Sequence, residues 1–425
     1  MREVLAPAAP RLSTWVGTLV ESATPPPCHS GSGARREREI YPGRMPTVFV
    51  PKERRPGETR VAASPETAKR FVKEGFAISV EPGAGLSAHF TDAEYVEAGA
   101  TLGSFDEAWP SADLVLMVGP VAAAEAARLK PSAVIVGLLA PFRSDAAVRA
   151  MAGGKVTSFA LELLPRTTRA QTMDALSSQA SIAGYKAALL GASGLGKCFP
   201  LSMTAAGTIR PARVVVLGAG VAGLSAIATA KRLGALVEVS DIRRAAKGDA
   251  ESLGAKFIEV PLDEEGDGQG GYAKEMTKEQ LEKQRVLVGD RIAGANVVIA
   301  TALVPGRPAP KLIPESVVAR MRPGSIIVDL AAPEGGNCEL TEPDRDVTHH
   351  GVLIIGQTNL VATVATDASL VYARNCLALA LHLLKKGELV IDTADDIVRG
   401  TLLTHAGAIT HEATAKRLEK ETTNG

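Results

Sequence analysis

Short apolar runs alternate with helical patterns along the chain from residue 46 onward. Within residues 47–85, a β-branched run, a polar turn, a helical stretch opened by Ser64 and Pro65, and a second apolar run follow one another. A serine followed by proline marks a helix start, and β-branched runs bounded by turn residues predict strands. The runs "DLVLMVG", "AVIVGLL" and "KVTSFALELL" continue the alternation to about residue 165. The pattern predicts an α/β domain.

A second set of strands follows a long helical segment. Residues 170–190 have apolar positions three and four residues apart, which predicts a helix that links two domains. The runs "RVVVLG", "LVEVSD", "KFIEV", "NVVIATA", "SIIVDLA" and "VLIIGQTN" then predict a full doubly wound sheet between residues 211 and 365. After residue 366, "DASLVYARNCLALALHLLKKG" predicts an apolar helix that ends at Gly387 and packs on the first domain.

A glycine-rich turn joins the first strand of the second set to a helix. The strand predicted at residues 213–217 runs into a G-x-G-x-x-G sequence formed by Gly218, Gly220 and Gly223. The first glycine permits a tight turn, the second lets a pyrophosphate approach the backbone, and the third lets helix and strand pack closely. Strand, turn and helix together predict a dinucleotide-binding site.

An acidic residue, Asp241, ends the next predicted strand. A carboxylate at this place can accept hydrogen bonds from the adenosine ribose of a dinucleotide. Asp241 also repels a 2′-phosphate, which favours NAD over NADP, although Arg243 and Arg244 leave NADP open. The other candidates for cofactor contact beside the turn and this strand end are Val221, Ile242 and Arg243.

These assignments predict an α/β fold of two Rossmann-like doubly wound domains, with the NAD-binding domain inserted into the other. The first α/β domain is discontinuous, with residues 46–178 plus 366–425, and the Rossmann NAD-binding domain has residues 179–365. Residues 1–45 are predicted to be a disordered N-terminal extension, because they lack a continuous apolar run. A cleft between the two domains is the expected active site.

Composition and charge narrow the possible functions. The chain is 46% hydrophobic and 22% charged, the balance of an α/β enzyme, and its 47 basic and 47 acidic residues cancel, so we expect no nucleic-acid partner. No apolar run approaches the roughly 18 residues of a spanning helix. Four scattered cysteines without a C-x-x-C pair, and no metal-ligand spacing, predict no metal and a cytoplasmic protein.

Seven motifs after residue 45 resemble one family. They are "VPKERRPGETRVAASPE", "LELLPRTTRAQTMDALSSQASIAGYKAA", "MTAAGTIRPARVVVLGAGVAGLSAIATAKRLGA", "GGYAKEM", "TALVPGRPAPKLI", "IIVDLAAPEGGNCELTEP" and "GQTNL". With them the chain resembles the NAD-binding subunit (domain I of the alpha subunit) of proton-translocating NAD(P) transhydrogenase, which is related to alanine dehydrogenase. The resemblance implies direct hydride transfer between NAD(H) on this chain and NADP(H) on a partner subunit. It further implies a homodimer, an NADP-binding beta subunit, a membrane-spanning transhydrogenase subunit, and peripheral association with the inner membrane through these partners.

The same resemblance implies the residues of the site. The catalytic positions are Arg166, Gln171, Asp174, Ser177 and Tyr185, on the loop and helix that hold the nicotinamide end in this family. Hydride transfer between two nicotinamides needs aligned rings in a dry pocket, and no proton leaves either carbon. An amide for the ring carboxamides, with a guanidinium and a carboxylate that hold the loop, suits such a reaction. Without the resemblance, "PRTTRAQTMD" is typical of a polar helix cap.

Two further segments enter the site by resemblance. The Gly-rich, charged stretch at residues 263–280 predicts a surface loop, and in the family a mobile loop here closes over the nucleotide, which implies Gly271 and Tyr272 as contacts. Thr301, Ala302 and Leu303 follow a predicted strand and are implied to line the NAD site, although an apolar strand end explains them equally well.

An amino-acid oxidoreductase similar to alanine dehydrogenase is the main alternative. Oxidative deamination needs a proton acceptor and a cationic anchor, which that family supplies with a His, a Lys and an Asp. Here Leu138, Met117 and Pro333 stand at those positions, and none of them titrates. A non-catalytic NAD-binding sensor is the second alternative, and it has no need of Arg166 and Gln171.

The segment "LVATVATDASL", after Asn359, lacks the proline that the transhydrogenase pattern has there. The edge of the expected NAD pocket is therefore left open.

Overall fold

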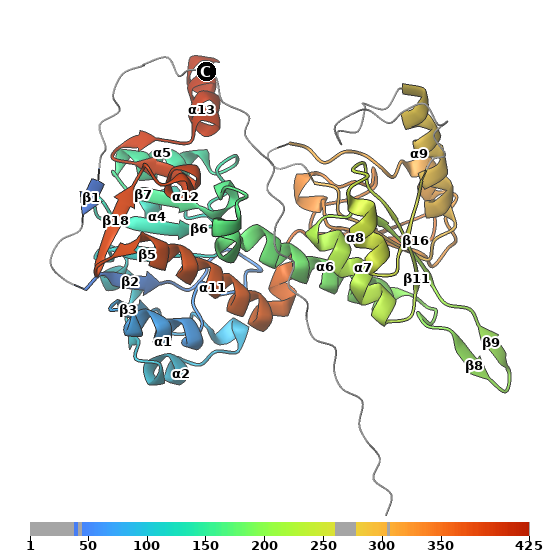
Figure 1. The fold of residues 1–425 in the computed structure, drawn as a ribbon, viewed down its shortest axis with the longest axis horizontal. Coiled ribbons are helices and arrows are strands. Elements are labelled where there is room, and N and C mark those ends of the chain that lie inside the picture. Colours follow the sequence, from blue (N-terminus) through green and yellow to red (C-terminus); the bar gives the residue numbers. More distant parts are fainter. Residues whose placement is uncertain (1–37, 41–44, 260–277, 304–306, 425) are drawn as a thin grey trace, which may run out of the picture. The chain divides into compact units, whose positions relative to one another are not determined.

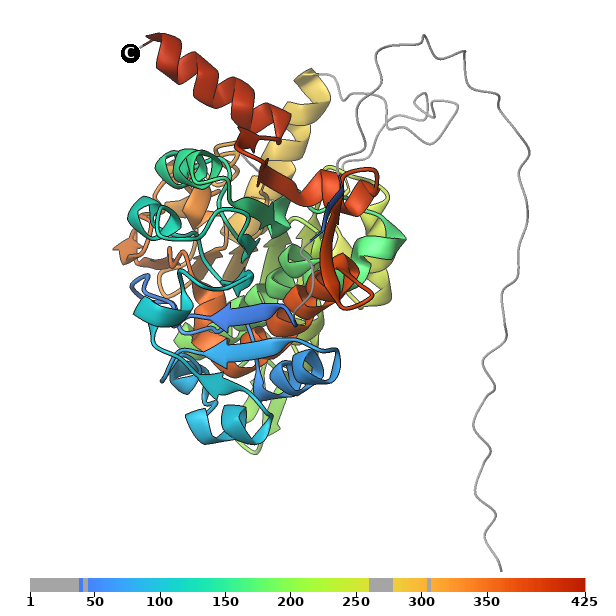
Figure 2. The same cartoon turned by 90° about the vertical axis from the view of Figure 1, so that its left-hand side faces the viewer.

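The computed structural model describes residues 38–40, 45–259, 278–303 and 307–424. They form two large sheets with helices on both faces, together with a small three-stranded sheet and a two-stranded hairpin (Figures 1 and 2). The predicted α/β class with two Rossmann-like sheets is confirmed. Within these residues, none of the helices is both long enough and apolar enough to cross a membrane.

The first large sheet has eight strands in the order β20-β19-β7-β6-β5-β2-β3-β4. The strands are β2 (Thr47–Val50), β3 (Ala77–Val80), β4 (Thr101–Leu102), β5 (Leu114–Leu116), β6 (Val134–Gly137), β7 (Thr157–Ala160), β19 (Leu402–His405) and β20 (Ala408–Ile409). Strands β2 to β7 pair in parallel, and β19 joins β7 antiparallel. The sheet thus combines an N-terminal segment of the chain with a C-terminal one.

Helices cover both faces of this sheet. They are α1 (Pro65–Lys73), α2 (Asp92–Glu97), α3 (Phe105–Ala108), α4 (Ala123–Ala126), α5 (Asp145–Gly153), α11 (Ala365–Leu383), α12 (Asp396–Thr401) and α13 (Glu412–Asn424). Phe71 of α1 and Tyr372 of α11 belong to the core on one face, while Trp109, at the end of α3, and Met151 of α5 belong to the core on the other. The apolar helix predicted after residue 366 therefore does pack on the first sheet.

The second large sheet has seven strands in the order β12-β11-β10-β13-β14-β16-β15. The strands are β10 (Arg213–Leu217), β11 (Leu236–Ser240), β12 (Lys256–Phe257), β13 (Val297–Ala300), β14 (Ile326–Asp329), β15 (Asp346–His349) and β16 (Val352–Ile355). Only β15 pairs antiparallel. Every residue of β13 and β14 is buried, which explains their unbroken apolar runs, because a parallel sheet carries helices on both faces. Those helices include α7 (Val221–Arg232), α8 (Ala246–Ser252), α9 (Lys278–Ala293) and α10 (Glu315–Val318).

The remaining strands form two small sheets. Strand β18 (Glu388–Asp392) lies between β1 (Arg38–Ile40) and β17 (Leu384–Lys385), and β8 (Ser202–Thr204) pairs with β9 (Gly207–Ile209). Residues 1–37 and 41–44 of the predicted extension lie outside the described residues. The predicted domain boundaries stay a prediction.

Two helix ends differ from the expected ones. The helix predicted to reach Gly387 ends at Leu383, because the chain continues into the β17–β18 hairpin, whose turn has positive φ at Lys386 and Gly387. The long helix predicted over residues 170–190 is α6 (Ala175–Gly194). Residues 168–173 before it form 3₁₀ turns, and the side chain of Asp174 caps α6 by accepting from the Ser177 backbone N–H. A local capping group therefore sets the start of α6 later than the apolar spacing suggested.

Helix α6 lies along α7 with very close backbone contact (Figure 1). A Cβ atom added to Gly184 of α6 would lie 1.9 Å from the carbonyl oxygen of Ala222, in the first turn of α7. Only glycine permits this approach, so Gly184 sets the distance between α6 and the start of α7.

Replacing Gly184 with alanine should force α6 and α7 apart. We expect Gly184→Ala to lower the free energy of unfolding by about 1–3 kcal/mol, the usual cost of overpacking, measured by denaturant titration. Gly248→Ala is the matched control, since its new Cβ on α8 would meet nothing within 4 Å. An unchanged stability for Gly184→Ala would contradict the close contact.

Candidate functional site

The glycine turn lies at the carboxyl end of β10, where the order of the second sheet reverses between β10 and β13. Gly218 has φ 99°, and a Cβ on it would lie 2.6 Å from the Thr301 hydroxyl oxygen. A Cβ on Gly223 would lie 1.9 Å from the carbonyl oxygen of Gly218. A Cβ on Gly220, by contrast, would meet nothing within 4 Å, so the N-terminus of α7 is open there to a ligand. Backbone N–H groups at such a turn can hold a pyrophosphate.

Asp241 reaches back to this turn from the end of β11. Its carboxylate accepts hydrogen bonds from the backbone N–H of Ala219 at 2.7 Å and of Arg243 at 2.7 Å, and the Arg243 guanidinium lies 3.1 Å away. Burial alone would raise the pKa of Asp241, but the bonds from Arg243 and Ala219 outweigh it and hold the pKa below its usual value. The group beside the turn is therefore a carboxylate at neutral pH.

Residues after β13 complete this edge of the sheet. Thr301 Oγ1 donates to the backbone oxygens of Leu217 at 3.0 Å and Gly218 at 3.1 Å. The backbone of Ala302 exchanges two hydrogen bonds with the Asn337 side chain, at 3.0 and 2.8 Å. The structure thus brings Gly218, Asp241 and Thr301 to one place, as expected for strand ends on both sides of a reversal in strand order.

Three apolar side chains around this edge are exposed. Ile242 is 83% exposed, Leu303 44% and Val221 43%, and a flat ligand could cover all three without displacing protein atoms. The other two predicted cofactor contacts, Gly271 and Tyr272, lie outside the described residues.

The predicted nicotinamide residues are only partly brought together. Asp174 accepts from the Ser177 backbone N–H at 2.9 Å and from its hydroxyl at 2.5 Å, which is a helix cap. Arg166 and Gln171 are exposed on the segment before α6, and Tyr185 is exposed further along the helix. The polar-cap interpretation of "PRTTRAQTMD" therefore describes Asp174 correctly, while Arg166 and Gln171 stay open to a ligand.

The segment that carries Arg166 and Gln171 is anchored from beneath. Ala170 and Met173 are buried in the core, and the Asn375 side chain of α11 donates to the Thr172 backbone oxygen at 2.8 Å. Arg169 pairs with Asp395 at 3.0 Å and with Asp396 at 2.9 Å. Sequence reasoning missed these anchors, although the one Asn within the apolar pattern of α11 was a usable signal.

Two buried carboxyl groups lie where sequence reasoning found nothing that titrates. Glu53 accepts from the backbone N–H of Val118 at 2.6 Å, beside the buried Met117. Glu162 accepts from the backbone N–H of Ala140 at 2.7 Å, in the loop that carries Leu138. Burial raises the pKa of each group to about 7. Met117 and Leu138 are thus flanked by carboxyl groups, but these bind backbone N–H groups of the loops.

A pocket of about 430 Å³ opens at the carboxyl ends of β2 and β5, where the order of the first sheet reverses. Its polar lining includes Lys52, Arg54, Arg55 and Arg143, with Met117 among the apolar residues. Arg143 also donates to the backbone oxygen of Pro333 at 2.9 Å. The pocket does not include the segment of Arg166 and Gln171. Among the described residues, no group of three His, Cys, Asp or Glu side chains could hold a metal ion.

These features define a doubly wound α/β protein with a dinucleotide-type glycine turn. Family models for the alanine dehydrogenase/PNT N-terminal and C-terminal domains match residues 49–183 and 187–412. The chain belongs to the alanine dehydrogenase/PNT family, which confirms the resemblance. The C-terminal model extends over β19 and β20, although these strands pair in the first sheet.

Individual relatives come from both branches of the family. The first section of the NAD(P) transhydrogenase alpha subunit of Rhodospirillum rubrum, a separate chain there, is 48% identical over 378 residues, which cover 86% of this chain and 98% of that protein. The crystal structure of transhydrogenase from Sinorhizobium meliloti matches with a TM-score of 0.79 and 43% identity, covering 85% of this chain and 99% of that one. The alanine dehydrogenase of Mycobacterium tuberculosis is 30% identical over 381 residues, 87% of this chain and 96% of that protein.

The raised pKa of Glu162 predicts a pH-dependent stability. The native state binds the proton more tightly than the unfolded chain, so this contribution is complete below about pH 4.5 and is lost as the pH rises through about 7. At about 1.4 kcal/mol per pKa unit, the loss is roughly 3 kcal/mol. Glu162→Gln cannot ionise and should lack it.

Urea unfolding of both proteins at pH 4.5 and pH 8 measures the difference. Glu97→Gln, which changes an exposed carboxylate, serves as the control and should follow the wild type. If Glu162→Gln shows the same pH dependence as the wild type, Glu162 is ionised in the native state and the assignment is wrong.

Proposed function

We propose that this chain is the NAD(H)-binding subunit of a proton-translocating NAD(P) transhydrogenase. It presents NAD(H) so that hydride passes directly to or from NADP(H) held on a partner subunit. The observation that carries the proposal is the glycine turn with the ionised Asp241 beside it, in a chain that is 48% identical to a transhydrogenase alpha-subunit chain over nearly that protein's whole length.

The choice of NAD(H) is supported by the charges at the turn. Asp241 can accept both ribose hydroxyl hydrogen bonds and repels a 2′-phosphate. Arg243, the nearest cation, is engaged by Asp241 through two ion-pair contacts, at 3.1 Å each. Its guanidinium is therefore neutralised by the same carboxylate that a 2′-phosphate would have to approach.

The chemistry needs positioning more than acid–base groups. Nicotinamide supplies the hydride, and the protein has to hold two rings together and exclude water. Gln171 offers an exposed amide for the ring carboxamide, on a segment anchored by Asn375 and Arg169. The buried carboxyl groups of Glu53 and Glu162 bind backbone N–H groups and take no part in such a transfer.

The same proposal includes the partners. We infer a homodimer that associates with an NADP-binding beta subunit and with a membrane-spanning transhydrogenase subunit. Proton movement then takes place in the partners, and the chain is a cytoplasmic protein attached to the inner membrane through them. The names of the transhydrogenase relatives support this set, since they are subunits.

Removing the carboxylate of Asp241 should weaken NADH binding. We expect Asp241→Ala to cost about 1–3 kcal/mol of binding free energy, the penalty for leaving polar groups unpaired, measured by titration calorimetry. Asp249→Ala, an exposed acid on the following helix, is the control and should bind NADH like the wild type. Unchanged affinity in Asp241→Ala would remove Asp241 from the site.

Shortening Gln171 should lower the rate before it lowers affinity. We expect Gln171→Asn to reduce hydride transfer by about tenfold or more, because a contact misplaced by about an ångström costs rate, with NADH affinity within a few fold. The assay mixes the purified chain with an NADP-loaded beta subunit and follows reduction of an acetylpyridine analogue by NADH. Thr168→Ser, on the same exposed segment, is the control.

The alternatives give different results in that assay. Turnover of L-alanine with NAD at an enzymatic rate would replace the proposal by an amino-acid dehydrogenase. NADH binding without any hydride transfer to the loaded partner would leave a sensor. Equal losses of rate and affinity in Gln171→Asn would contradict its role at the ring.

A further inference from the structure

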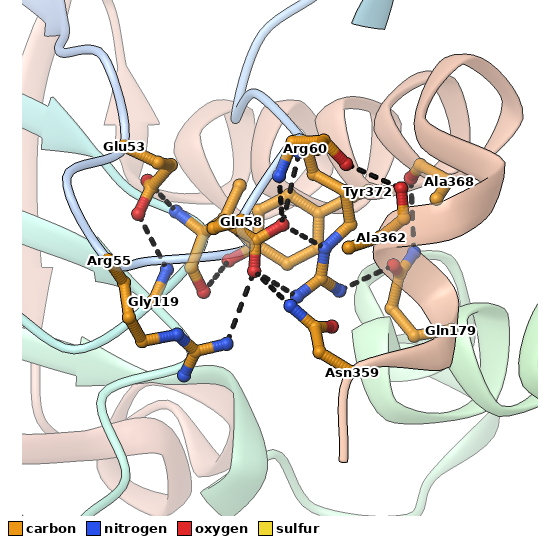
Figure 3. A network of polar contacts seen from close by, with 12 residues as sticks. Glu53, Arg55, Glu58, Arg60, Gly119, Gln179, Asn359, Ala362, Ala368 and Tyr372 are labelled. Atoms are coloured by element: carbon orange, nitrogen blue, oxygen red, sulfur yellow. Dashed lines mark hydrogen bonds and ion pairs between the residues drawn. The ribbon is translucent and has the colours of Figure 1, made fainter. Parts of the chain in front are cut away.

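A buried ion pair lies on the segment between β2 and α1. The Glu58 side chain has no exposed surface, and the Arg60 side chain is 7% exposed. Arg60 Nε donates to Glu58 Oε1 and Nη2 donates to Oε2, both at 2.7 Å, which makes a bidentate pair (Figure 3). Burial alone would raise the pKa of Glu58, but Arg60 outweighs it and the pKa lies below its usual value. Glu58 is therefore a carboxylate inside the protein.

Each member of this pair holds one of the two segments that connect the large sheets. Arg60 Nη1 donates to the side-chain oxygen of Gln179, in α6, at 2.9 Å. The Asn359 side chain, in the segment between β16 and α11, donates to Glu58 Oε2 at 3.1 Å. Figure 3 shows Gln179 and Asn359 beside the same guanidinium–carboxylate pair.

Neighbouring contacts reinforce the same connection. The Thr59 hydroxyl donates to the backbone oxygen of Ala362, and the Gln179 amide donates to the backbone oxygen of Ala368 in α11 at 3.1 Å. The chain leaves the first sheet through α6 and returns through the 3₁₀ turns of Leu360–Val364 into α11. Both passages therefore meet at one short segment of the first sheet's β2–α1 loop.

Stability alone does not explain a pair of this kind. Burying both charges costs about as much as their attraction returns, and well-packed apolar residues often do as well. What a buried bidentate pair supplies is a defined geometry, since its partners satisfy it in one arrangement only. The absence of a proline after Asn359 makes such a fixed point useful, because the returning segment has no rigid φ of its own at that place.

We propose that Glu58 and Arg60 form a latch that holds the two connecting segments in register, so that Gln179 and Asn359 are positioning residues for hydride transfer. The latch connects both halves of the site. Gln179 follows Ser177 on α6, and its neighbour Ser178 is linked through Asn375 to the segment of Gln171. Asn359 follows β16 of the dinucleotide-binding sheet. This inference rests on the proposed function.

The test removes a neutral partner and leaves the ion pair intact. Asn359→Ala should lower hydride transfer by about tenfold, with NADH affinity within about threefold, because a small displacement of one ring costs rate before binding. Thr366→Val is the matched control. Its hydroxyl also bonds a backbone oxygen, that of Ala88, but within the first sheet and its helices, so transfer should stay within about twofold.

A double-variant cycle separates a latch from two local defects. Gln179→Leu alone should slow transfer by a similar factor, and Gln179→Leu with Asn359→Ala should be about as slow as the slower single variant, since both act through one pair. Multiplied effects would mean that the two residues act independently, and the latch would be wrong.

Hydrogen exchange tests the latch without any catalysis. In Asn359→Ala, backbone amides of residues 356–364 should exchange at least about tenfold faster than in the wild type, with the strands of both sheets unchanged. Unchanged exchange would overturn the latch. Faster exchange with unchanged transfer would overturn the positioning role, and a wild type that transfers no hydride would overturn the proposed function while exchange still decides on the latch.

Discussion

The close contact between α6 and α7 is the constraint on which the rest of the molecule depends. Helix α6 begins at the cap of Asp174, directly after the segment of Arg166 and Gln171, and passes Ala222 at the distance that Gly184 allows. Ala222 is next to the glycine turn. One rigid helix therefore carries both the start of the proposed nicotinamide segment and the packing surface for the proposed pyrophosphate turn, which makes their separation a property of backbone packing.

Polar groups within the fold serve mainly to hold loops. Glu53 and Glu162 each bind backbone N–H groups beyond a strand of the first sheet, and burial makes the ionisation of each unfavourable. Glu58 stays ionised because Arg60 contacts it at both oxygens, and a cation compensates a buried negative charge more fully than N–H groups do. Amino-acid oxidation needs a group that takes a proton from substrate, whereas Glu53 and Glu162 are already bound to the backbone. Together with the exposed amide of Gln171, this distribution favours a site that aligns two rings.

The sequence by itself determined the features that depend on near neighbours. Strand, glycine turn, helix and Asp241 follow one another within about thirty residues, so their spacing was enough to predict the turn and the carboxylate beside it. The two Rossmann-like sheets were likewise predictable, because buried parallel strands leave unbroken apolar runs. Even the polar-cap interpretation of "PRTTRAQTMD" contained the observed cap at Asp174.

Only the tertiary structure decided which distant residues meet. Glu58 and Asn359 are about three hundred positions apart, and nothing in the local pattern around either residue indicates the other. The anchors of the Gln171 segment, the buried carboxyl groups of the first sheet, and the early end of α11 at Leu383 depend in the same way on contacts between separate elements. A pattern along the chain records how each element buries its own apolar face, whereas the pairing of buried polar groups is settled only when those faces have packed.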